Sequence, residues 1–158
     1  MSDLSDEELS RGTPPPKQAL LVLRLIWAAL LIGQLIFAGM VWSLRHDAAP
    51  ADDPTARLLS MVAMVFIVIA APAAFVVRSF IYRAAKKGEI VDASGYTTGN
   101  IIFLAILEGV SFFGLVVILI TGWVVPTAIV PGVAILIQLF NFPTGRPMRD
   151  PYATHDSL

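Results

Sequence analysis

Four long apolar runs constrain the fold of this chain more than any other feature. They cover residues 25–44, 58–77, 101–120 and 123–142, and Glu108 is the one charged residue within them. About 20 apolar residues in a helix cross a hydrocarbon core that is about 30 Å thick. In lipid, a helix satisfies its own backbone groups, whereas an isolated strand cannot. The sequence therefore predicts an all-α integral membrane protein, a bundle of four transmembrane helices.

Polar segments divide the chain around these runs. Residues 1–17 are acidic and then proline-rich, which predicts a disordered N-terminal tail. Residues 143–158 predict a second short tail, so the transmembrane domain covers residues 18–142. Only Thr121–Gly122 separates the last two runs, which must therefore form antiparallel neighbours. With the first two runs paired in the same way, the bundle would consist of two antiparallel hairpins.

Lysine and arginine predict the orientation of the bundle. Only Arg45 and Arg57 fall on one side of the alternating topology, and nine cations fall on the other. Cytoplasmic loops carry the excess of such residues, so we expect both termini in the cytoplasm. The composition suits a bacterial inner membrane. The nine cations are Arg11, Lys17, Arg24, Arg78, Arg83, Lys86, Lys87, Arg146 and Arg149.

Composition and motifs argue against several function classes. A net charge of −1 gives no global basic signal for nucleic acid, and the absence of cysteine removes thiolate chemistry and thiolate metal sites. We find no paired carboxylates, no HExxH, no nucleophile elbow and no phosphate-binding glycine loop. Loop acids such as Asp53 and Asp92 are expected to be solvated or to cap helices. We therefore expect a non-enzymatic protein with no cofactor, no metal and no evident small-molecule substrate.

Glu108 is the exception in this apolar pattern. It lies within LAILEGVSFFG, in the third run. A carboxylate in the middle of a bilayer costs a few kcal/mol, and a neutral, protonated acid still needs an acceptor for its O–H. The sequence thus predicts a buried, protonatable Glu108 that either joins helices or binds an ion.

Four groups are candidates to support Glu108. Gln34 lies roughly 15 Å into its run and Glu108 roughly 12 Å into its own, measured from the same membrane edge. Ser111 follows Glu108 by one turn. Pro72 cannot donate to the Val68 carbonyl, so that carbonyl is a further possible acceptor. We expect Glu108 to donate to Val68 or to Gln34.

The third run also carries a family resemblance. The stretch IIFLAILEGVSFFGLVVILITGWVVP is similar to the carboxylate helix of the c subunit, or proteolipid, of rotary ATP synthases. The preceding helix and the loop YRAAKKGE resemble the rest of that hairpin, so the resemblance covers residues 58–126. The whole chain also resembles small uncharacterised four-helix bacterial membrane proteins. The matching residues are Ala105, Glu108, Gly109, Gly114, Leu115 and Val116.

The resemblance implies that Glu108 binds and releases a coupling ion as a ring turns past a stator. Gly109 stands where sodium-binding members carry a hydroxyl, which favours a proton. The glycine run of the family's first helix has no counterpart, because residues 58–77 contain no glycine. Two functions stay open: a membrane protein that packs or assembles with itself or a larger complex around Glu108, or a proton-translocating subunit of a rotary ATPase or related ion-transport complex.

Overall fold

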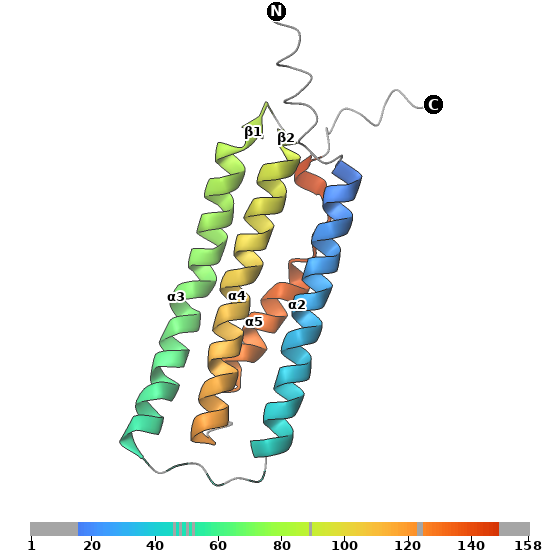
Figure 1. Ribbon diagram of the computed structural model, residues 1–158. Coiled ribbons are helices and arrows are strands. Elements are labelled where there is room, and N and C mark those ends of the chain that lie inside the picture. The colour runs from blue at the N-terminus through green and yellow to red at the C-terminus, as the bar shows by residue number, and fades with distance from the viewer. Residues whose placement is uncertain are drawn as a thin grey trace, which may run out of the picture.

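Four helices, a short hairpin and a single 3-10 turn make up the described part of the chain (Figure 1). The computed structural model describes residues 16–45, 47, 49, 51, 53–88, 90–122 and 125–148. Most of both predicted tails lies outside these residues. The elements are α2 (Pro16–Arg45), α3 (Pro54–Ala84), β1 (Lys86–Lys87), β2 (Ile90–Val91), α4 (Ala93–Thr121), α5 (Ile129–Phe140) and η1 (Arg146–Met148).

Three of the helices are long and apolar enough to cross a membrane. α2, α3 and α4 contain 30, 31 and 29 residues. At 1.5 Å per residue each is about 45 Å long, which exceeds a hydrocarbon core of about 30 Å. Three of the four predicted spans are therefore confirmed as membrane-length helices, and the chain is a multi-pass helical membrane protein.

Asp53 and Asp92 begin two of these helices, as predicted. The Asp53 carboxylate accepts a hydrogen bond from the Thr55 amide at 3.1 Å, at the start of α3. The Asp92 carboxylate accepts one from the Ser94 amide at 3.3 Å, at the start of α4. Each bond satisfies an amide that has no partner within its helix, so the caps fix where α3 and α4 start.

Helix α4 lies at the centre of the bundle. It packs against α3 along one side and against α2 along the other, and α5 passes behind it in the view of Figure 1. The first two long helices are antiparallel, as predicted, but α4 lies between them. The predicted first hairpin is therefore opened, with the third long helix inserted between its two members.

Small residues allow the helices to approach closely. Ala70 and Ala74 lie on the buried side of α3, which faces α4 and α5. A Cβ added at Gly99 would lie 2.7 Å from Cε1 of Tyr82, and one added at Gly114 would lie 2.9 Å from Cδ of Pro131. These contacts need glycine because a side chain would push α3 or α5 away from α4.

The fourth predicted span is not one long helix. α5 has 12 residues, about 18 Å, which is too short to cross the hydrocarbon core. Prolines explain the difference. Pro126 precedes the helix, Pro131 is tolerated because it lies in the first turn, and Pro143 follows the end of the helix by three residues.

The chain beyond α5 continues along the bundle without regular helix. Residues 141–145 lead into η1, which lies near the start of α2 (Figure 1). The Gly145 amide donates to the Tyr96 hydroxyl at 3.0 Å, and Met148 packs on the core beside Tyr96. The predicted C-terminal tail therefore begins as a segment docked on the bundle.

Candidate functional site

Glu108 lies near the midpoint of α4, about 20 Å from either end. Its side chain is half-buried, so the prediction of a buried acid is wrong for a single copy of the chain. None of the residues that the structure describes forms a hydrogen bond or an ion pair with its carboxyl. The acid is therefore a polar group at mid-membrane depth with an exposed edge and no partner on the described part of its own chain.

The surface beside Glu108 is one exposed stripe of α4. An added Cβ at Gly109 would meet no atom within 4 Å, so the backbone is open to the outside at this point. Because α5 covers the opposite, buried side of α4, this stripe faces away from the rest of the bundle. We call it the open face, defined by Ile101, Ala105, Gly109, Val116 and Ile120.

The structure pairs Gln34 with a different residue from the one predicted. Gln34 and Gln138 are both fully buried. The Gln34 Nε2 donates to Gln138 Oε1 at 3.0 Å, and the Gln138 Nε2 donates back to Gln34 Oε1 at 3.4 Å. This reciprocal amide pair joins α2 to α5. The Gln34 side chain is thus directed at α5, and Glu108 does not have the expected glutamine partner.

The predicted Val68 acceptor is also on the wrong side of its helix. Val68 is 70% exposed, and Pro72 is exposed as well. The stripe of α3 that packs on α4 and α5 is formed by Ala63, Ile67 and Ala70. The carbonyl that Pro72 frees therefore lies on the outer side of α3, away from Glu108.

Ser111 lies close to Glu108 in sequence but on the buried side of α4. It is fully buried, and its hydroxyl has no hydrogen-bond partner among the described residues. An unpaired buried hydroxyl costs free energy. The structure thus brings none of the four predicted supporting groups into a hydrogen bond with Glu108.

Two buried hydroxyls form a bond that the sequence analysis missed. The Thr127 hydroxyl donates to Ser60 Oγ at 3.0 Å, and both residues are buried. This bond joins α3 to the turn before α5. The available signal was that Ser60 is the one polar residue of its run, and a lone polar residue in a membrane helix commonly bonds to another helix.

A second missed cluster lies toward the η1 end of the bundle. The Arg78 guanidinium donates to Asn141 Oδ1 at 3.1 Å, and its central carbon lies 4.1 Å from the centre of the Phe103 ring. Asn100 donates to the Tyr82 hydroxyl at 2.6 Å. Aromatic rings and an amide thus surround a half-buried cation, an arrangement that holds helices together.

The segment after α5 is tied to α2 by two side chains. Trp27 Nε1 donates to the Gln138 carbonyl at 3.0 Å, and its ring meets Phe142 edge-on, with 5.0 Å between ring centres. Arg24 Nε donates to the Pro143 carbonyl at 3.3 Å. The Gln138 carbonyl also accepts from the Asn141 amide at 3.2 Å, so the Trp27 bond adds a second donor to it, and the Arg24 bond holds the chain beyond α5.

Across the described residues, no three histidine, aspartate or glutamate side chains gather as metal ligands. Glu108 with the open face therefore remains the candidate site. No protein-family model matches the chain, and no similar curated protein or solved structure was found.

Proposed function

We propose that this chain is a non-enzymatic membrane protein that assembles with a second copy of itself through the open face. The observation that carries the proposal is the position of Glu108, which is half-buried at mid-membrane depth and has no partner among the described residues. Lipid cannot accept its hydrogen bond, and a polar group in that position is costly. A protein surface that covers Glu108 and supplies a partner removes this cost.

A second copy has the right chemistry to do so. A protonated carboxyl has both a donor and an acceptor, so two of them can bond reciprocally. A two-fold contact places the same residue of both copies at its centre, which is what such a pair requires. Glu108 is the one acid in the apolar runs, and those runs contain no base, so its best complement from this chain is another Glu108.

The shape of the open face also favours a close helix contact. Ala105 and Gly109 are four residues apart, which is the small-xxx-small spacing of closely crossing membrane helices. Both are exposed, and the space above Gly109 is empty. Two α4 helices that cross at Gly109 bring their Glu108 side chains to the same depth.

The orientation of the bundle belongs to the same proposal. Described cations gather at the end where α2 starts and η1 ends, whereas Arg45 and Arg57 lie toward the other end. The excess of cations supports a cytoplasmic location for the first end and for both termini. We infer an inner-membrane protein of bacteria with this orientation.

Substitution of Glu108 tests the assembly. The full-length protein is purified in mild detergent, and its oligomeric state is read by light scattering over a concentration series. We expect a dimer that Glu108→Leu converts to a monomer. Glu108→Gln should remain dimeric, because two amides can pair reciprocally as Gln34 and Gln138 do. A dimer that Glu108→Leu leaves intact would contradict the proposal.

The second candidate function is proton translocation in a c-like subunit. The observation that favours it is again the exposed edge of Glu108, because such a carboxyl can be reached from the lipid phase. A hydrophobic carbodiimide across a pH series separates the two functions. Rapid labelling of Glu108 that fades as the pH rises supports proton exchange at a lipid-facing acid. Protection of Glu108 in the wild-type dimer supports the paired carboxyls.

A further inference from the structure

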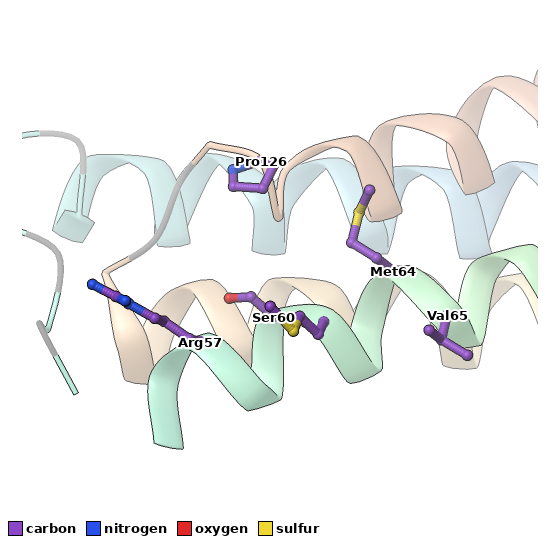
Figure 2. A pocket seen from close by; sticks show the side chains of 6 residues that line it. Arg57, Ser60, Met64, Val65 and Pro126 are labelled. Carbon is purple, nitrogen blue, oxygen red and sulfur yellow. The ribbon is translucent and has the colours of Figure 1, made fainter. Parts of the chain in front are cut away.

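An apolar groove opens on the outer surface of α3, away from Glu108. It has a volume of about 540 Å³, within the range of ligand sites in proteins. Figure 2 shows Pro126, from the turn before α5, facing α3 across this groove. The lining residues are Arg57, Ser60, Met61, Met64, Val65 and Pro126.

The groove has one charged end. Arg57 lies in the first turns of α3 and is exposed at that end (Figure 2), whereas the rest of the lining is almost wholly apolar. Ser60 is the other polar residue, and its hydroxyl is already bonded to Thr127. The groove therefore offers a cation near the end of a membrane helix and a hydrocarbon surface below it.

A second groove of about 630 Å³ continues from the first. The two share Met61 and Val65, and the second extends along α3 to Ile69. From Arg57 to Ile69 the helix rises about 18 Å, which is more than half of the hydrocarbon core. Methionine side chains adapt to irregular partners, so Met61 and Met64 suit a flexible chain.

We propose that these grooves bind an anionic phospholipid, with its phosphate at Arg57 and one acyl chain in each groove. Charge complementarity selects this occupant, since an arginine has five N–H donors and can bind a phosphate oxygen beside the interaction that Arg57 already makes. The apolar surface starts beside the charge and runs into the membrane, as the chains of a lipid do. The site shares no residue with the open face, so it does not depend on self-assembly.

Lipid binding to the full-length protein tests the proposal. Native mass spectrometry compares retention of phosphatidylglycerol with retention of phosphatidylcholine carrying the same acyl chains. We expect about fivefold stronger retention of phosphatidylglycerol, the contribution of one basic residue at a membrane surface. Arg57→Gln should remove this preference, and Arg57→Lys should keep most of it.

Matched variants distinguish binding at this site from effects of any lost cation or any added tryptophan. Arg45→Gln removes a cation that does not line the groove and should keep the preference. Val65→Trp fills both grooves and should lower retention of both lipids, whereas Val76→Trp, outside them on the exposed side of α3, should not. Equal retention of the two lipids by the wild type would overturn the proposal. The proposal would also be overturned if Arg45→Gln and Arg57→Gln lost the preference for phosphatidylglycerol equally. It would be overturned as well if Val65→Trp retained both lipids as strongly as the wild type.

Discussion

At the residue scale, four buried polar side chains in the described part of this membrane protein are joined in pairs that link separate segments of the bundle. Gln34 bonds to Gln138, and Ser60 bonds to Thr127. Each pair satisfies groups that lipid or a hydrocarbon core would leave without partners. Glu108 differs because its carboxyl is partly exposed and bonds to none of the described residues. The two pairs are contacts within the chain, whereas in the proposed dimer the contact of Glu108 is completed by a second copy.

The glutamine pair leads to a prediction about stability. Gln34→Leu leaves the Gln138 amide buried without its partner, and we expect it to lower the free energy of unfolding by about 1–2 kcal/mol. Unfolding in mixed micelles with increasing dodecyl sulfate measures this change. The double variant Gln34→Leu, Gln138→Leu should cost less than the sum of the two single variants. Strictly additive losses would show that the two amides do not act as a pair.

Ser111 leads to the opposite expectation. Its hydroxyl is buried and has no partner among the described residues, so replacing it removes an unpaired polar group. Ser111→Ala should therefore leave the free energy of unfolding unchanged or raise it by up to about 1 kcal/mol. The same micelle unfolding experiment measures it. A loss of more than 1 kcal/mol would mean that the hydroxyl has a partner outside the described residues.

At the element scale, glycines of α4 have two different roles. Gly114 faces α5, where a Cβ would press on the rigid ring of Pro131, whereas Gly109 faces open space. Gly114→Val should lower the free energy of unfolding by about 1–3 kcal/mol through overpacking. Gly109→Val should leave monomer stability nearly unchanged and weaken the dimer. Gly39→Val, on an exposed side of α2, is the matched control and should change neither.

All three glycine variants are compared by micelle unfolding, which measures stability, and by light scattering, which measures dimerisation. If Gly109→Val destabilised the fold as much as Gly114→Val, the open face would be part of the internal packing. If Gly39→Val weakened the dimer as much as Gly109→Val, the contact would involve α2 rather than α4.

The sequence predicted three of the four membrane-length helices correctly, but it did not predict which side of its helix a polar residue lies on. Uninterrupted apolar runs identified α2, α3 and α4 because length and hydropathy alone decide whether a helix can cross a membrane. The fourth run was predicted as a full span, but Pro126 and Pro131 shorten it to α5. The orientation of Glu108 was not predictable, since α4 is apolar on all sides and no polar stripe marks its outer face.

At the scale of the whole molecule, the described chain begins and ends at the same end of the bundle (Figure 1). The positive-inside bias then predicts which end faces the cytoplasm. The chain has no cysteine, so single cysteines report orientation directly. In intact cells, an impermeant maleimide should label Ala49→Cys and should leave Lys86→Cys unlabelled. The reverse pattern would show that the protein is inverted relative to the proposed orientation.

The central claim is that two copies meet at the open face of α4, and cysteine cross-linking in native membranes tests it most directly. A disulfide forms only where Cα atoms approach within about 7 Å, so it reports a close helix crossing. Mild oxidation of Ala105→Cys should yield a covalent dimer, which an added Glu108→Leu abolishes and an added Glu108→Gln preserves. Val76→Cys on α3 and Val133→Cys on α5 are exposed controls and should stay monomeric. A monomeric Ala105→Cys, or equal cross-linking at all three positions, would contradict the account.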